Sequence, residues 1–180
     1  MAGRRLHYEL AFEDYLRNCR LPYVAVHEAR RAIGAAGPVK AFDFIVYSRL
    51  AANLLVDVKG RRLPERKSGV SRFWPNWSTV EDLTGLDRWQ RAFGPDFRAV
   101  LAFVYGIAAP GVCQAGFDDL HVYRDRAYGL VAVTLEAYQR HQRPRSPRWQ
   151  TVYVPQRIFK LICRPISYFL GEARPASERN

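Results

Sequence analysis

Two aspartates and one lysine interrupt otherwise apolar segments of the sequence. Asp43 lies within Phe42-Asp-Phe-Ile-Val-Tyr47, and Asp57 lies within Leu54-Leu-Val-Asp-Val-Lys59. A charged carboxylate in such surroundings is unfavourable unless it is paired with a cation or bound to a metal. Paired carboxylates beside a lysine suit Mg²⁺, which takes one or two carboxylates and keeps several waters. The alternative is a buried aspartate–lysine salt bridge with Asp43 capping a turn, and composition alone does not choose between the two.

The two apolar segments are predicted to be adjacent strands. Side chains two residues apart on a strand point to the same face, so Asp57 and Lys59 are expected to project together. The chain between Asp43 and Asp57 is long enough for a hairpin with a turn around Ser48 to Asn53, which lets the two carboxylates meet. The glycine and proline of the segment Gly60 to Pro64 predict that the strand 54–59 ends at Lys59.

The neighbouring segments predict an α/β fold, with a mixed central sheet and helices on its faces. A helix between two strands at this spacing indicates a parallel crossover onto the same sheet. The hydroxyl and acids of Ser78-Thr-Val-Glu-Asp82 are typical of the start of that helix. The predicted elements are a helix from Leu6 to Cys19, a strand from Tyr23 to His27, a connection from Glu28 to Pro38, the strands 42–47 and 54–59, a helix from Ser78 through Phe93, and a strand from Phe97 to Tyr105.

The chain after Gly106 is predicted to form a β/α extension of this core. A chain of 180 residues is one domain by default. We therefore expect a single domain over residues 1–170, with a core at 6–105, an extension at 106–170 and a frayed tail at 171–180. The elements expected in the extension are edge strands at His121–Tyr123 and Leu130–Val133, a helix at Leu135–His141, a strand at Thr151–Val154 and a helix at Ile158–Cys163.

The charge of the chain indicates a polyanionic partner. The formal net charge is +11 and the isoelectric point is about 10.0, which favours nucleic acid as a partner but says nothing about fold. Flat aromatic side chains at Phe73, Trp74, Trp77 and Trp149 offer faces on which bases can stack. The alternative for each basic cluster is an ordinary solvated surface. The basic side chains predicted to contact phosphates are Arg61, Arg62, Arg66 and Lys67, directly after the strand 54–59, and Arg143, Arg145 and Arg148 near the C-terminus.

Cysteine usage and hydropathy predict a cytoplasmic protein without a membrane segment. Cys19, Cys113 and Cys163 are odd in number and far apart, so they indicate neither a disulfide framework nor a zinc site. No apolar run approaches the roughly 18 residues that a membrane span needs. A reducing compartment fits these features best.

The order of the acidic residues resembles a known nuclease superfamily. A helix glutamate, a strand aspartate and then a strand Asp-x-Lys is the order of the PD-(D/E)XK superfamily, which has a restriction-endonuclease-like αβββαβ core and includes archaeal Holliday-junction resolvases. The opening His7-Tyr-Glu-Leu-Ala-Phe-Glu13 also matches, letter for letter, the motif that names the HYExAFE family of uncharacterised proteins. The resemblance covers residues 6–105. Phe42 departs from the pattern, because it stands where the superfamily name has proline.

This resemblance implies a metal-dependent active site. It implies that Asp43 and Asp57 bind Mg²⁺, with Mn²⁺ as an alternative, and that the Val58 carbonyl is a further ligand. Lys59 would then orient and activate the attacking water. DNA is the implied substrate, RNA is not excluded, and a homodimer is one assembly that the resemblance allows.

The resemblance also implies that the N-terminal helix supplies a glutamate to the site. Glu9 and Glu13 both qualify, because they lie one turn apart on nearly the same face of the helix. We favour Glu9 slightly. The choice between the two stays open at the level of sequence.

Three functions are compatible with these observations. The leading hypothesis is a Mg²⁺-dependent endonuclease that acts on DNA. The second is a nucleic-acid-binding protein without activity that keeps the nuclease-like fold. The third is a basic protein-interaction module, in which Asp43, Asp57 and Lys59 form a structural ion cluster.

Overall fold

The computed structural model describes residues 7–26, 32–34, 37–66, 69–70, 73–108 and 116–171. The centre of the molecule is a mixed sheet in the order β1-β4-β5-β9-β11-β10, with β14 paired to β11. β5 and β9 pair in parallel, and the other described strand pairs of this sheet are antiparallel. The strands are β1 (Tyr23–Ala25), β4 (Phe44–Val46), β5 (Asn53–Arg62), β9 (Phe97–Ile107), β10 (Leu120–Tyr123), β11 (Arg126–Thr134) and β14 (Arg164–Pro165).

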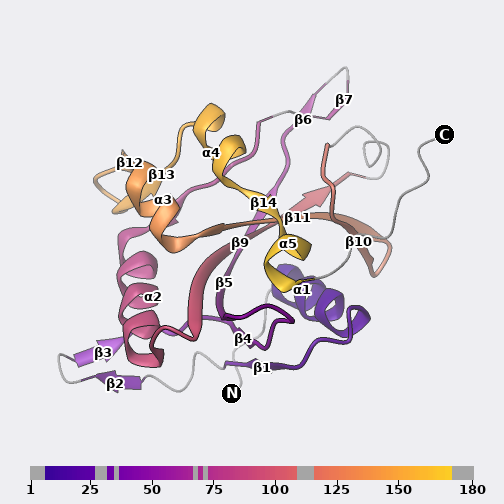
Figure 1. Cartoon of the computed structure of the whole chain (residues 1–180). Helices are drawn as coiled ribbons and strands as arrows, with labels where there is room; N and C mark the ends of the chain where they lie inside the picture. The colour runs from indigo at the N-terminus through magenta and orange to yellow at the C-terminus, as the bar shows by residue number, and fades with distance from the viewer. Residues whose placement is uncertain are drawn as a thin grey trace, which may run out of the picture.

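Helices cover both faces of the central sheet (Figure 1). On one face lie α2 (Val80–Phe93), α3 (Leu135–His141) and α4 (Gln156–Ile162), and on the other lie α1 (His7–Asn18) and α5 (Ile166–Leu170). Each face has its own buried apolar cluster, so the sheet separates two cores. The predicted α/β fold with helices on both faces is thereby confirmed.

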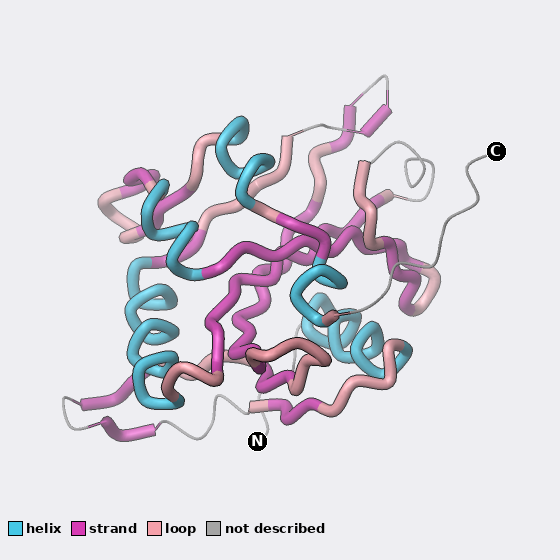
Figure 2. The backbone as a smooth tube through the Cα atoms, in the orientation of Figure 1, coloured by secondary structure: helices cyan, strands magenta, loops and turns pink. Residues whose placement is uncertain are grey.

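Three smaller sheets are attached to this body. β12 (Arg143–Ser146), β13 (Thr151–Tyr153) and β8 (Ser78–Thr79) form a three-stranded antiparallel sheet, with β8 leading directly into α2. In Figure 2 this small sheet lies beside the N-terminal end of α2. The other two are the hairpins β2 (Ala32–Gly34) with β3 (Gly37–Val39), and β6 (Glu65–Arg66) with β7 (Gly69–Val70).

The alternation of side chains along β5 decides where its charged residues point. Val56 and Val58 pack in the core beneath α1, whereas Leu55 packs in the core beneath α2. Asp57 and Lys59 share the face of Leu55, because side chains alternate along a strand. Asp57 and Lys59 therefore project together, as the sequence predicted, and the structure places them on the face covered by α2.

Most predicted elements are present close to their predicted positions. α1 and α2 begin and end within two residues of the predicted helices, apart from residues outside the described ranges. The crossover β5–α2–β9 is parallel, as expected, and β4 and β5 form the predicted hairpin. The predicted elements at 121–123, 135–141, 151–154 and 158–163 correspond to β10, α3, β13 and α4.

The structure corrects four of the predictions. β5 continues through the expected turn to Arg62, because β9 supplies hydrogen-bonding partners along its whole length. The strand expected at 130–133 is not an edge, since β11 lies between β9 and β10. Asp43 precedes β4 instead of lying inside it, and the described part of the expected connection 28–38 contains the β2–β3 hairpin.

Gly60 lets β5 pass close to α1. A Cβ atom at this position would lie 2.1 Å from Cδ2 of Tyr8, so the Tyr8 ring occupies the space that any other residue would fill. The glycine that suggested a turn is therefore needed for a close approach of helix to strand. This contact sets the position of α1, which carries Glu9.

Of the predicted tail 171–180, only Gly171 lies within the described ranges, at the end of α5. None of the described helices is long and apolar enough to cross a membrane.

Candidate functional site

Asp43, the residue before β4, lies beside Asp57 of β5. The Asp43 N–H donates to the Val56 carbonyl oxygen at 2.9 Å, and Asp43 Oδ2 accepts a hydrogen bond from the Val58 N–H at 2.6 Å. Asp43 thus binds the backbone of β5 on both sides of Asp57. The side-chain carboxylate replaces a backbone partner where β4 has not yet begun, and this brings the two acids together.

Lys59 contacts two carboxylates. Its Nζ atom lies 3.0 and 2.9 Å from the two carboxylate oxygens of Asp57, and 2.8 Å from Oδ2 of Asp82 at the start of α2. Asp57 and Asp82 are 8% and 7% exposed. The ammonium group is therefore held between a strand and a helix, in a site largely closed to water.

The surroundings of Asp43 disfavour its charged form. Burial raises the pKa of Asp43 well above its usual value, and the negative charges of Asp57 and Glu9 raise it further. The Val58 N–H and the Lys59 ammonium act in the opposite direction but are outweighed. Burial likewise raises the pKa of Asp57, and the Lys59 ammonium offsets only part of that shift.

The two candidate glutamates have different surroundings. Glu9 contributes to the electrostatic field at Asp43. Glu13 Oε1 instead accepts hydrogen bonds from the Tyr23 hydroxyl at 2.8 Å and from Arg17 Nη2 at 2.9 Å. Of the two glutamates, Glu9 is therefore the one whose charge acts on Asp43.

The donor set fits one hard divalent cation. Among the residues that the structure describes, no three His, Cys, Asp or Glu side chains converge into a ready-made metal site. Mg²⁺ needs only one or two carboxylates, since water fills its remaining positions. The cluster has four carboxylates and two ammonium groups, a formal excess of two negative charges. These groups are Glu9, Asp43, Asp57, Asp82, Lys40 and Lys59.

Two members of this cluster were not identified from the sequence. Asp82 was expected only as an acid at a helix start, and it does form a capping box with Thr79. Lys40, whose ammonium contacts Asp82, follows a predicted connection and has no local signal. Their roles depend on the packing of α2 against β5, which no local pattern encodes.

The residues predicted to contact phosphates differ in how far they are exposed and in whether the structure describes them. Arg61 is partly buried, donates to the Trp77 carbonyl and lies 3.8 Å from the centre of the Trp77 ring, so it is part of the packing. Arg62 is exposed. The side chain of Arg66 and the whole of Lys67 lie outside the described parts of the chain. Arg143, Arg145 and Arg148 are exposed.

The last three arginines define what we call the basic hairpin, residues 143–153. Arg145 lies 5.3 Å from the centre of the Trp77 ring, and Arg148 lies 5.2 Å from that of Trp149, which is 66% exposed. Through β13 the hairpin pairs with β8, at the start of α2. The basic hairpin therefore adjoins the helix end that carries Asp82.

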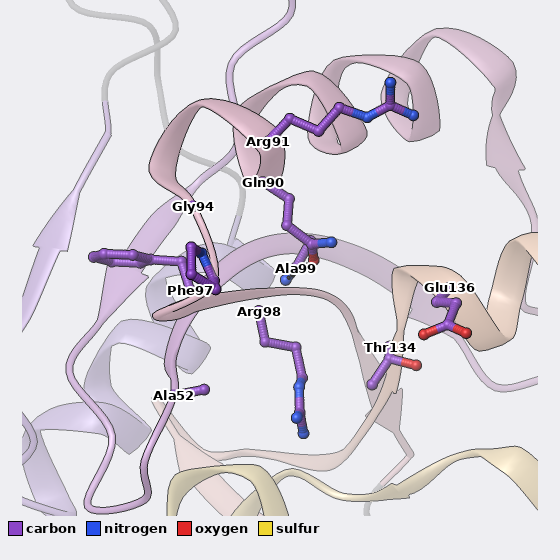
Figure 3. A pocket seen from close by; sticks show the side chains of 10 residues that line it. Ala52, Gln90, Arg91, Gly94, Phe97, Arg98, Ala99, Thr134 and Glu136 are labelled. Carbon is purple, nitrogen blue, oxygen red and sulfur yellow. Dashed lines mark hydrogen bonds between the residues drawn. The ribbon is translucent and has the colours of Figure 1, made fainter.

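A cavity of about 470 Å³ lies elsewhere, between the C-terminal end of α2 and the start of α3 (Figure 3). Arg91, Arg98 and Glu136 contribute its charged groups. Gln90 also lines it, and its Oε1 accepts a hydrogen bond from the Ala99 N–H at 2.6 Å. None of the acids or lysines of the candidate site lines this cavity.

The fold has a counterpart among solved structures. It is similar to a Holliday junction resolvase from the archaeal hyperthermophile Archaeoglobus fulgidus, with a TM-score of 0.53 and 13% sequence identity, and the match covers 92% of this chain and 98% of that chain. At this identity the likeness establishes the fold alone, which is that of the resolvase. No protein-family model and no curated protein matches the sequence, so the resemblance to the HYExAFE family is not confirmed.

Proposed function

We propose that this protein is a metal-dependent nuclease that hydrolyses phosphodiester bonds in DNA. The observation that carries the proposal is the contact of Asp43 with the backbone on both sides of Asp57, beside the Lys59 ammonium. Two adjacent carboxylates with raised pKa values are a poor arrangement for a purely structural cluster. A divalent cation removes that disadvantage, because it neutralises both groups.

The residues of the site have distinct parts in this chemistry. Asp43 and Asp57 would hold Mg²⁺, or Mn²⁺ in its place, with the Val58 carbonyl as a further ligand. When bound, the ion polarises the phosphate and lowers the pKa of a water molecule. Lys59 places a positive charge beside the nucleophile, and Glu9 orients water from the side of α1.

Charge supports nucleic acid as the substrate. The formal net charge of the whole chain is +11, although the site itself is acidic. The basic hairpin lies next to the start of α2 and carries exposed guanidinium groups and an exposed indole. Phosphate contacts of this kind position a substrate without reading its sequence.

A cleavage assay tests the proposal. Because the fold neighbour is a Holliday junction resolvase, labelled four-way junctions are incubated beside linear DNA and RNA, in Mg²⁺, Mn²⁺ or EDTA. We expect metal-dependent cleavage of at least one DNA. Lys59→Met should lower kcat by about 10²–10³-fold, whereas Lys160→Met, an exposed lysine of α4, should cleave like the wild type. Equal cleavage by both variants would refute the assigned role of Lys59.

One observation favours a second candidate. Both oxygens of Asp57 contact Lys59, as they would in a structural ion cluster of an inactive nucleic-acid-binding protein. That candidate predicts salt-sensitive DNA binding with no cleavage in either metal. The same assay, run beside a binding measurement, separates the two functions.

A further inference from the structure

Lys59 has an anionic partner outside the acid-x-lysine pattern. Asp82 Oδ2 lies 2.8 Å from Lys59 Nζ, which is as close as either oxygen of Asp57. Asp82 comes from α2, on the far side of the ammonium group from the central sheet. Two carboxylates from different elements therefore fix one ammonium group.

α2 holds the Asp82 carboxylate in one place. Asp82 Oδ2 accepts hydrogen bonds from the Ser78 hydroxyl and the Thr79 N–H, both at 3.2 Å. The Asp82 N–H donates in turn to Thr79 Oγ1 at 3.1 Å, which completes the capping box. The Lys40 ammonium contacts the other carboxylate oxygen. The carboxylate is thus set by the helix start and not by a flexible side chain.

Asp82 also keeps its charge. Burial alone would raise the pKa of Asp82, but the Lys59 and Lys40 ammonium groups outweigh burial and hold the pKa well below its usual value. Asp43 and Asp57 have raised pKa values instead. Of these three acids, Asp82 is the one whose surroundings stabilise the carboxylate form.

We propose that Asp82 is a positioning residue for Lys59, holding its ammonium group beside the site when Asp57 engages another cation. The inference rests on the proposed function. A lysine anchored by Asp57 alone would lose its partner to any cation that binds Asp57, and its long side chain would then regain rotamer freedom. A second carboxylate, fixed by a helix cap, prevents this and preorganises the positive charge.

Two variants of the same helix cap separate positioning from stability. Asp82→Asn keeps the size and an acceptor oxygen for Thr79 but removes the charge that faces Lys59. Thr79→Ala removes the other half of the capping box and leaves the Asp82–Lys59 contact in place. We expect Asp82→Asn to lower kcat by about 10–100-fold with KM for DNA within about twofold, and Thr79→Ala to keep kcat. Asp82→Glu, which restores the charge, should recover part of kcat.

A second readout needs no activity. The chain has four lysines, so ¹⁵N NMR of the side-chain ammonium groups can resolve Lys59, with Lys59→Met as the assignment control. We expect a slowly exchanging Lys59 signal in the wild type and in Thr79→Ala, with and without Mg²⁺. In Asp82→Asn the signal should persist without metal, where Asp57 still contacts Lys59, and should be lost when Mg²⁺ is added. A wild type without cleavage would refute the nuclease, while this signal still tests the anchor. A Lys59 signal that persists in Mg²⁺ in folded Asp82→Asn would overturn the proposal.

Discussion

Replacing Asp43 by Asn is predicted to stabilise the metal-free protein while abolishing cleavage. The Asp43 carboxylate is partly buried, faces Asp57 and Glu9, and has a raised pKa even with the Val58 hydrogen bond at 2.6 Å in place. Asparagine keeps an acceptor for Val58 and removes the charge. We expect a gain of about 1 kcal/mol, the usual size for a favourable substitution, and a Tm about 2–4 °C higher for a chain of this length.

The gain in stability from Asp43→Asn depends on pH. Because the folded-state pKa of Asp43 lies above the unfolded value of about 3.9, charging the group destabilises the fold. The cost is absent below the unfolded pKa, grows as the pH rises towards the folded pKa, and is constant above it. The gap in Tm between Asp43→Asn and the wild type should therefore be near zero at about pH 3 and largest at neutral pH.

Thermal unfolding followed by circular dichroism in EDTA measures both effects. Asp87→Asn is the matched control, because Asp87 forms an i,i+4 ion pair with Arg91 on the surface of α2. Asp87→Asn should change the free energy of unfolding by no more than about 0.5 kcal/mol. Added Mg²⁺ should raise the Tm of the wild type but not that of Asp43→Asn. A lower Tm for Asp43→Asn at neutral pH would refute the electrostatic reasoning.

Other substitutions test the elements around the site. Gly60→Ala should destabilise the protein by about 1–3 kcal/mol in urea unfolding, because the new methyl group would collide with the Tyr8 ring; an unaltered midpoint would mean that α1 is not held there. Asp119→Ala removes two hydrogen bonds to Ser167, at 2.8 and 3.0 Å, and should cost about 1–3 kcal/mol in the same assay; a loss below 0.5 kcal/mol would speak against this cap of α5. Arg143→Gln should reduce the slope of log K against log salt for DNA binding by about 0.9, and an unchanged slope would remove Arg143 from the interface.

The sequence predicted the parts of the fold that have strong local signals. The apolar runs of β5 and β9 and the helix start within Ser78 to Asp82 are encoded in neighbouring residues, so apolar runs and capping residues were enough to predict these elements. The end of β5 did not follow in this way. Gly60 suggests a turn locally, but the partner strand β9 and the Tyr8 ring decide its conformation.

The same distinction holds for the candidate site. Asp43, Asp57 and Lys59 could be selected because charges in apolar strands are rare, and the β4–β5 pairing brings them together. Asp82 was visible only as a helix cap, since its contact with Lys59 arises from the packing of α2 on the sheet. Lys40 had no signal in its own segment. Long-range packing, which local patterns do not contain, completes the site.

Calorimetric titration of the metal-free protein with Mn²⁺ tests the central claim most directly. We expect one ion per chain for the wild type, and binding too weak to measure for both Asp43→Asn and Asp57→Asn, since each removes a carboxylate that would hold the ion. Asp87→Asn should bind like the wild type. Absence of binding to the wild type, or binding by either site variant as tight as that of the wild type, would contradict a metal centre at these two aspartates.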